Sequence, residues 1–132
     1  SKTALADFGI KACKHINSNA IVLVREYTPG GYHVIGMGAG QPNRVDAVRK
    51  LALTKARENM EALGLPEAKT FAECVLISDA FFPFPDNIHN AAEAEIRFIV
   101  EPGGSLRDDE VIAAADDHGI ALLFTGMRHF RH

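Results

Sequence analysis

The segment Ser78–Asn87 (SDAFFPFPDN) concentrates aromatic and carboxylate side chains. Three phenylalanines surround Pro83 directly after a continuous apolar run, where a loop leaves backbone donors available. Such a loop suits a flat heteroaromatic ligand, and Asp86 could accept hydrogen bonds from amino groups of that ligand. The alternative is that the phenylalanines only plug the end of a sheet. Composition alone favours this alternative, because most aromatic side chains belong to the core.

A glycine turn, Glu101–Asp108 (EPGGSLRD), forms a second candidate site. Backbone N–H groups ahead of a helix could hold an anion or a carbonyl oxygen there, and Ser105 would add a hydroxyl. The spacing is not that of a P-loop. A strand-to-helix turn capped by Asp108 is an equally simple interpretation.

Two further segments carry arginines that suit a phosphate. Gly38–Arg44 (GAGQPNR) has small residues, a helix start and then a cation, although it lacks the dinucleotide-binding GxGxxG spacing. Arg44 would oppose the helix dipole, which indicates an anionic ligand unless the arginine is simply solvated. The final segment Arg128–His132 (RHFRH) offers arginine forks for a phosphate monoester and histidines for proton transfer, unless it is only a charged end.

The histidines and cysteines give little support for a metal site. Among the six histidines only the final segment contains an HxxH pattern, and the zinc-deaminase signature is missing from the sequence. Cys13 and Cys74 lie far apart in the sequence without a CxxC pattern. We predict two buried thiols, with a single disulfide as the alternative. Lys14 and His15 end an amphipathic helix, so we expect a structural or rim position for them.

The composition describes one globular domain over residues 1–132. The chain has a hydrophobic fraction of 47%, a charged fraction of 23% and a net charge of −3. These values exclude a disordered chain and argue against a nucleic-acid partner, which would need a basic surface. No apolar run has the length of a membrane span, and the N-terminus has no signal-peptide layout. We therefore expect a soluble, cytoplasmic protein without a membrane partner.

The order of apolar runs predicts an α/β protein with a three-layer sandwich. Strands that alternate with helices imply parallel pairs, and the early hairpin makes the sheet mixed. Ligands of such sheets lie beyond the carboxyl ends of the strands, so we expect chemistry in the loops 78–86, 102–107 and 125–132. A polar loop is expected over 66–70. The predicted helices cover 4–16, 43–63, 87–95 and 108–118, and the predicted strands cover 20–26, 32–37, 73–77, 97–100 and 120–124.

The longest predicted helix, over 43–63, has one apolar and one charged side. Its apolar stripe comprises Val45, Val48, Ala52, Ala56 and Leu63. The charged side, which we expect to face solvent, comprises Arg44, Arg49, Lys50, Lys55, Arg57, Glu58 and Glu61.

Several motifs in order resemble one family. The stretch from SDAFFPFPDN to the final RHFRH, with SNAIV at 18–22 and GAGQ…R at 38–44, closely resembles the C-terminal end of bacterial bifunctional purine biosynthesis proteins. Specifically, it resembles the domain that formylates aminoimidazole carboxamide ribonucleotide (AICAR). The resemblance covers nearly the whole chain except 28–33 and 58–72. It implies a cytidine-deaminase-like unit, the second of a tandem pair.

The resemblance also implies an activity and a partner. The family transfers a formyl group from 10-formyltetrahydrofolate to the amine of AICAR during IMP synthesis. Its catalytic Lys-His pair belongs to the first unit, so this chain would need a complementary half and would be inactive alone. The family's ring-closing activity lies in a separate domain. A binding module for a nucleotide or folate, without chemistry, is the alternative function. The family also implies homo- or hetero-oligomers and, in some members, a potassium ion near Ser18 and Asp79.

Carried onto matching positions, the resemblance assigns roles to individual residues. It places Asn19 beside the reacting groups and has His132 close the site. The ribonucleotide would contact Arg44, Arg128, Phe130 and Phe81. The folate side would be lined by Phe82, Pro83, Asp86, Asn87 and Ser105.

Three departures from the family pattern affect local backbone and charge. Pro85 stands where an arginine is usual, Glu95 where a glycine is usual, and Pro42-Asn43 differs ahead of Arg44.

Overall fold

The computed structural model describes residues 2–14, 20–39, 45–80, 82 and 85–125. Every predicted helix and strand is present in this part of the chain, with ends shifted by a few residues. The helices are α1 (Lys2–Lys14), α2 (Val45–Leu63), α3 (Glu67–Glu73), α4 (Asp86–Glu93) and α5 (Asp108–His118). The strands are β1 (Ala20–Thr28), β2 (Gly31–Ala39), β3 (Val75–Ser78), β4 (Phe98–Glu101) and β5 (Ala121–Phe124).

Helix α3 occupies the region where we predicted a polar loop, so that prediction was wrong. The helix begins after Pro66, has Glu67 in its first turn and buries Thr70 and Phe71. Arg57 of α2 holds it in place, because its Nε lies 2.7 Å from Glu67 Oε1 and its guanidinium lies over the Phe71 ring. Seven residues are too few to show a helical apolar period, so only the tertiary contacts of Phe71 reveal the helix.

The strands form one mixed sheet in the order β2-β1-β3-β4-β5. Strand β1 pairs antiparallel with both β2 and β3, whereas β3 with β4 and β4 with β5 are parallel pairs. The predicted mixed α/β sheet is therefore confirmed. Because β3, β4 and β5 run in the same direction, their carboxyl ends lie at one edge, from which all three candidate loops leave.

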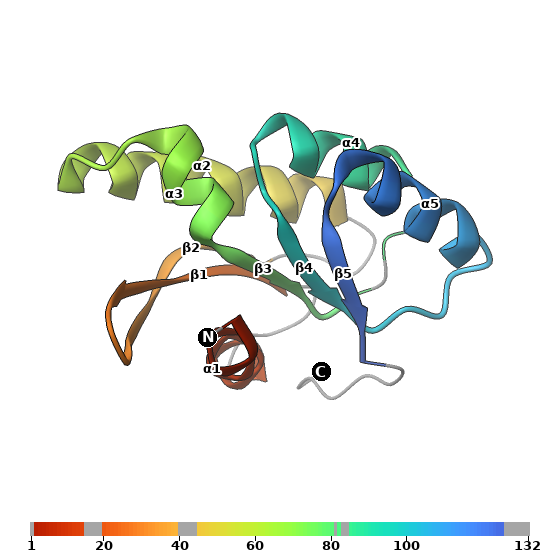
Figure 1. Cartoon of the computed structure of the whole chain (residues 1–132), viewed down its shortest axis with the longest axis horizontal. Helices are drawn as coiled ribbons and strands as arrows, with labels where there is room; N and C mark the ends of the chain where they lie inside the picture. The colour runs from red at the N-terminus through yellow and green to blue at the C-terminus, as the bar shows by residue number, and fades with distance from the viewer. Residues whose placement is uncertain (1, 15–19, 40–44, 81, 83–84, 126–132) are drawn as a thin grey trace.

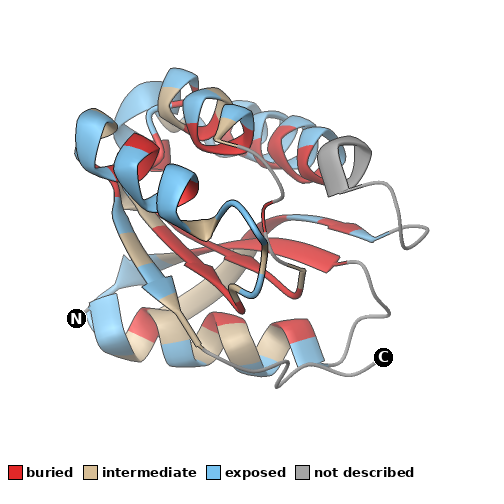
Figure 2. Ribbon diagram, turned by 90° about the vertical axis from the view of Figure 1, so that its right-hand side faces the viewer, coloured by how far each residue is buried: buried red, intermediate tan, exposed pale blue. Residues whose placement is uncertain are grey.

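Helices cover both faces of the sheet, as predicted for three layers. Helices α2 to α5 lie on one face and α1 lies on the other (Figure 1). Alternate side chains of β1 serve the two faces, so that Ile21 and Leu23 belong to one core cluster while Val22 and Val24 belong to the other. The central part of the sheet is buried between the helices (Figure 2).

Two glycines let the helices approach the sheet. A Cβ on Gly36 of β2 would lie 2.5 Å from the carbonyl oxygen of Ala52 in α2. A Cβ on Gly9 of α1 would lie 2.2 Å from Cδ1 of Ile77 in β3. Both positions therefore exclude larger side chains unless the two layers separate.

The cysteines are free and buried, as predicted. Cys13 packs in the core cluster on the α1 face and Cys74 in the cluster on the opposite face. The sheet lies between them, so the alternative of a disulfide was wrong. Burial raises the pKa of both thiols to about 12, which keeps them protonated and unreactive at neutral pH.

Helix α2 departs from its predicted faces at two positions. Ala52 and Ala56 are buried as expected, but Leu63 is 59% exposed. Arg49, expected in solvent, is only 3% exposed. It lines a polar hollow to which α4 contributes Asn90, Glu93 and Ala94. Within the described residues, no helix has the length and apolar character needed to cross a bilayer.

Among the described residues, helix α1 is the element on its face of the sheet, and it leaves part of the face uncovered. Helix α1 packs on β1 and β3, and beside it an apolar groove of about 230 Å³ opens over β4 and β5. Leu123 of β5 is 55% exposed on this bare face. The groove is lined by Lys2, Thr3, Ala6, Asp7, Ile10, Val75, Phe98, Ile99, Val100, Ala121, Leu122 and Leu123.

Candidate functional site

The three segments that follow β3, β4 and β5 meet at Glu101, the last residue of β4. Its Oε1 accepts the backbone N–H of Phe82 in the segment after β3, at 3.3 Å. Its carbonyl oxygen accepts the N–H of Thr125, the residue after β5, at 2.9 Å. Glu101 itself starts the glycine turn. One residue thus connects all three loops in which we expected chemistry.

The carboxyl group of Glu101 is buried, and no described cationic side chain pairs with it. The residue is 0% exposed, and Oε2 has no hydrogen-bond partner among the described residues. Burial raises the pKa of this carboxyl to about 8, and the nearby carboxylate of Asp108 adds to the rise. The N–H groups of Phe82 and Gly103 oppose the rise only in part. At neutral pH the group is therefore mostly a neutral acid, which can donate as well as accept a hydrogen bond.

The glycine turn already contains an anion of its own. The two carboxylate oxygens of Asp108 accept the N–H groups of Gly104 and Ser105, at 2.8 and 3.1 Å. The Ser105 hydroxyl oxygen accepts the N–H of Arg107, which leaves the hydroxyl proton to donate. Asp108 therefore holds this strand-to-helix turn, but it does not cap the helix as predicted, because the N-cap residue of α5 is Arg107 and no side chain caps it. The Ser105 hydroxyl, half-buried at the turn, remains the group through which it could contact a ligand.

The segment after β3 has one buried aromatic residue and one exposed carboxylate among its described residues. Phe82 is 0% exposed and packs in the core cluster beneath α2 to α5, so this ring plugs the end of the sheet. Asp86 is exposed in the first turn of α4, where a carboxylate is favourable. Asn87 follows it and is 3% exposed. Asp86 therefore presents an accessible acceptor near Phe82.

Most of the predicted site lies outside the described residues. These positions are Asn19, Arg44, Phe81, Pro83, Arg128, Phe130 and His132. The structure brings Phe82 and Ser105 to the same edge of the sheet through Glu101, and their roles stay predictions. Lys14, at the end of α1, is exposed as expected for a rim position, while His15 lies outside the described part.

A second buried acid, Asp79, joins β3 to the start of β1. Its Oδ1 accepts the N–H of Ala20 at 2.8 Å, and its own N–H donates to the Ala20 carbonyl at 3.0 Å. Potassium was expected near Ser18 and Asp79; Ser18 lies outside the described residues, so this ion stays a prediction. In the described part of the chain, no three His, Cys, Asp or Glu side chains gather as metal ligands.

Sequence reasoning missed Glu101. We treated it only as the start of the glycine turn. The available pattern was an acid that continues the buried run Phe98-Ile-Val100 and precedes Pro-Gly-Gly. A charged residue inside a buried strand is uncommon and indicates either a partner or a shifted pKa.

The fold is that of cytidine-deaminase-like α/β proteins. The crystal structure of a mutant of NE0047 in complex with 8-azaguanine matches 94% of this chain and 77% of its own, with a TM-score of 0.52 and 19% identity. That likeness concerns the fold alone. A diaminohydroxyphosphoribosylaminopyrimidine deaminase/reductase from Thermotoga maritima matches 92% of this chain and 35% of its own, at a TM-score of 0.47 and 18% identity. The first of these matches, together with the mixed five-stranded sheet, confirms the predicted fold class.

Sequence comparison identifies relatives of the chain, whereas the structural comparison shows only the fold. The family model of the AICARFT/IMPCHase bienzyme matches residues 1–55. The bifunctional purine biosynthesis protein PurH of Brucella anthropi is 52% identical over 125 residues, which are 95% of this chain and 22% of that protein. PurH of Brucella ovis gives the same identity and coverage. The predicted resemblance is confirmed: the chain corresponds to a fragment of the bifunctional purine biosynthesis proteins.

Proposed function

We propose that this chain forms part of the AICAR formyltransferase site in purine biosynthesis. The observation that carries the proposal is the 52% identity to PurH over 95% of the chain. The meeting of the three post-strand segments at Glu101 supports it, because it puts the predicted folate-side residues Phe82 and Ser105 at one edge of the sheet.

The reaction needs positioning more than a strong nucleophile. The amine of AICAR is weak, because the neighbouring carboxamide withdraws electron density. Its nitrogen attacks the formyl carbon carried on N10 of the folate and forms a tetrahedral oxyanion. The amine loses a proton, the bond from the formyl carbon to N10 breaks, and N10 takes up a proton. A site must align the two substrates, remove the proton and stabilise the oxyanion.

The proposed roles divide the reaction between two groups of residues. Asn19 orients the carboxamide or amine, and His132 closes the site. The nucleotide phosphate and base are held by Arg44, Arg128, Phe130 and Phe81. On the folate side, Asp86 accepts from amino groups of the pterin, Ser105 donates its hydroxyl proton, and Pro83 lines the same side. Phe82 and Asn87, which are 0% and 3% exposed, support this side from beneath. The proton-transfer histidine comes from a complementary half.

The bare groove over β4 and β5 supports the need for a second polypeptide segment. The chain spans 22% of the length of the relatives it matches, so most of their length lies outside it. An exposed apolar patch with Leu123 at 55% exposure is unfavourable in water and favours coverage by another surface. We propose that the complementary transformylase half covers this groove.

Reconstitution tests the proposal. We expect no formyl transfer from 10-formyltetrahydrofolate to AICAR by the chain alone, and turnover when the complementary half is added. Leu123→Asp should weaken association with that half by at least about tenfold in Kd, because it puts a charge on an apolar interface. Leu63→Asp is the matched control, since Leu63 is 59% exposed on the other side of the sheet. Turnover by the chain alone, or IMP ring closure without formyl transfer, would contradict the proposal.

A nucleotide- or folate-binding module without chemistry is the alternative. The Asp86 carboxylate and the Ser105 hydroxyl would serve binding equally well. Calorimetry with AICAR and with a folate, each with and without the complementary half, separates the two functions. Binding of either ligand in a reconstituted mixture that shows no turnover would favour the module.

A further inference from the structure

Glu101 is the described residue through which the segments after β3, β4 and β5 are joined. Its side chain reaches the segment after β3 through Phe82, and its backbone reaches the residue after β5 through Thr125. The bond to Phe82 lies outside the strand pairs and holds the segment after β3. The bond to Thr125 continues the parallel β4–β5 ladder by one residue, so it fixes where the last segment leaves the sheet. The carboxyl group is fully buried and is not part of the proposed reaction.

We propose that Glu101 is a positioning residue for the folate side of the proposed site, which it holds by accepting the Phe82 N–H. This inference rests on the proposed function and extends it to a residue that touches neither substrate. Phe82 directly precedes the segment that leads into Asp86 and Asn87, two predicted folate-side residues. The hydrogen bond at 3.3 Å therefore holds the segment after β3 against the end of β4, where the turn that contains Ser105 begins.

The surroundings of the carboxyl group explain why its proton matters. The group facing it from α5 is the Asp108 carboxylate, which raises its pKa, and the loops contribute only the N–H groups of Phe82 and Gly103. None of the described cationic side chains forms an ion pair with Glu101. Ionisation would leave a buried negative Oε2 without a hydrogen bond beside a second carboxylate. Water must then enter or the side chain must move, and either change displaces the Phe82 segment.

Glutamine is the informative substitution, because it keeps the acceptor and cannot ionise. Glu101→Gln preserves an oxygen for the Phe82 N–H and places an NH₂ group where the protonated Oε2 lies. Glu101→Ala removes the acceptor and leaves the buried Phe82 N–H unsatisfied. Glu95→Gln, at the other end of β4 and outside the proposed site, is the matched control for the loss of a carboxylate.

The chain is assayed together with the complementary half across pH 6.5 to 9. We expect the wild-type KM for 10-formyltetrahydrofolate to rise several-fold above about pH 8, with a smaller change in kcat. Glu101→Gln should hold the low KM throughout this range. Glu101→Ala should raise KM by about tenfold even at neutral pH, as expected for one unsatisfied buried N–H group. Glu95→Gln should follow the wild-type profile.

Hydrogen exchange of the Phe82 amide supplies a readout that does not need folate. Exchange should speed up with pH in the wild type more steeply than in Glu101→Gln, after correction for intrinsic exchange. A Glu101→Gln profile parallel to the wild type in both KM and exchange would overturn the inference. If neither the wild type nor any variant transfers formyl groups, the proposed function is wrong. The exchange profiles still show whether Glu101 holds the Phe82 segment. Should Glu101→Ala fail to fold, the glutamine comparison decides alone.

Discussion

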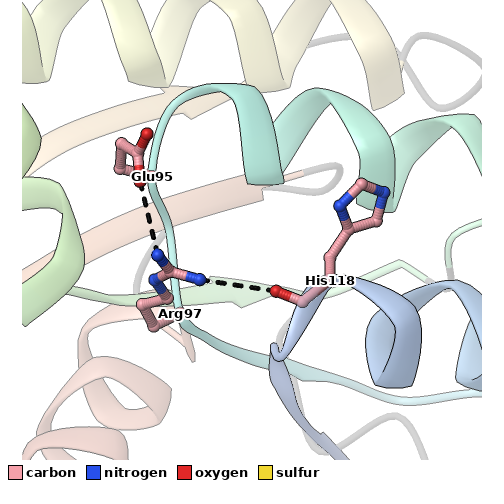
Figure 3. Close-up of polar contacts among 3 residues, drawn as sticks. All are labelled: Glu95, Arg97 and His118. Atoms are coloured by element: carbon pink, nitrogen blue, oxygen red, sulfur yellow. Dashed lines mark hydrogen bonds and ion pairs between the residues drawn. The ribbon is translucent and has the colours of Figure 1, made fainter.

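Strand β4 has a glutamate near each end, and the two side chains have opposite surroundings. Glu95 precedes the strand, has a side chain that is 49% exposed, and lies 3.5 Å from the guanidinium of Arg97. Arg97 also donates to the carbonyl oxygen of His118 at 3.4 Å (Figure 3). Glu101 ends the strand, is fully buried, and has one carboxylate oxygen without a partner among the described residues. The same residue type is exposed and beside a cation at one end, and at the other end it is fully buried with its pKa raised to about 8.

The difference shows where in this fold the ionisation of a carboxyl group is energetically unfavourable. At the amino end of β4, water and Arg97 screen the charge, so the interaction there contributes little to stability. At the carboxyl end, burial makes the ionised state expensive and ties the protonation of Glu101 to the geometry of three loops. Buried carboxyl groups with a strongly raised pKa are common at functional sites, and they are unusual at a strand end with a purely structural role.

Replacing the buried acid should give the largest effect. The pKa of Glu101 is raised from 4.5 to about 8, so the folded protein keeps a proton that the unfolded chain loses between these values. The wild type is then most stable below pH 4.5, as far as this group is concerned, and loses that contribution as pH rises to about 8. Glu101→Gln should be more stable than the wild type near pH 9 by on the order of a few kcal/mol and similar near pH 4.5. Urea denaturation across this range measures the difference; parallel curves would contradict it.

Gly103→Ala should come next, because it strains the turn that follows Glu101. Gly103 has φ of +74°, and a Cβ there would lie 3.0 Å from the Phe124 ring. We expect a loss of about 1–2 kcal/mol in the free energy of unfolding. Gly104→Ala, also at positive φ but with no atom within 4 Å of its Cβ, is the control. Equal losses in both variants would exclude a part for the Phe124 contact.

Glu95→Gly should stabilise the other end of β4. Helices α2, α4 and α5 end in the same motif, in which a residue at positive φ follows the last turn. Gly64 and Gly119 hold this position after α2 and α5, whereas Glu95 has φ of 69° after α4. Relief of this strain should outweigh the lost ion pair and raise stability by about 0.5–1 kcal/mol. Thermal unfolding measures it, with Glu95→Ala as the control that removes the carboxylate and keeps the strain. A Glu95→Gly protein no more stable than Glu95→Ala would contradict this.

Arg97→Ala should have the smallest effect. Its ion pair with Glu95 is long and half exposed, and such pairs contribute about 0–1 kcal/mol. We expect a loss of at most about 0.5 kcal/mol that shrinks further in high salt. A double-mutant cycle with Glu95→Ala measures the coupling. A coupling above that of an ordinary surface pair would mean that the two ends of β4 differ less than their exposure indicates.

The sequence predicted the elements well where apolar residues have a clear period. Strand β1 is an unbroken β-branched run, and α5 has acids in its first turn and a glycine after its last. Prediction failed where another element determines the environment. Helix α3 depends on the burial of Phe71, and Arg49 is buried where it lines the hollow between α2 and α4. Neither fact follows from the local sequence.

The described residues include Phe82, Asp86, Asn87 and Ser105 of the predicted site. Two features of this part show what the local sequence could and could not predict. The strand-to-helix interpretation of the glycine turn came from the local sequence, with Asp108 as the expected cap. In the structure the Asp108 carboxylate instead accepts the N–H of Gly104, four residues before it. The Phe82 ring, by contrast, could have faced a ligand or the core. Its burial depends on the helices that cover the sheet, and the sequence left both interpretations open.

The amino-acid sequence by itself determined the family resemblance, the alternation of strands and helices, and the edge of the sheet where chemistry is expected. These features depend on local periodicity, turn residues and short motifs. The tertiary structure alone decided that Glu101 lies at the meeting point of three loops and that its carboxyl group is neutral. The physical reason is that a pKa depends on the water and charges around a group, and here Phe82, Asp108 and the buried end of β4 come from distant parts of the chain.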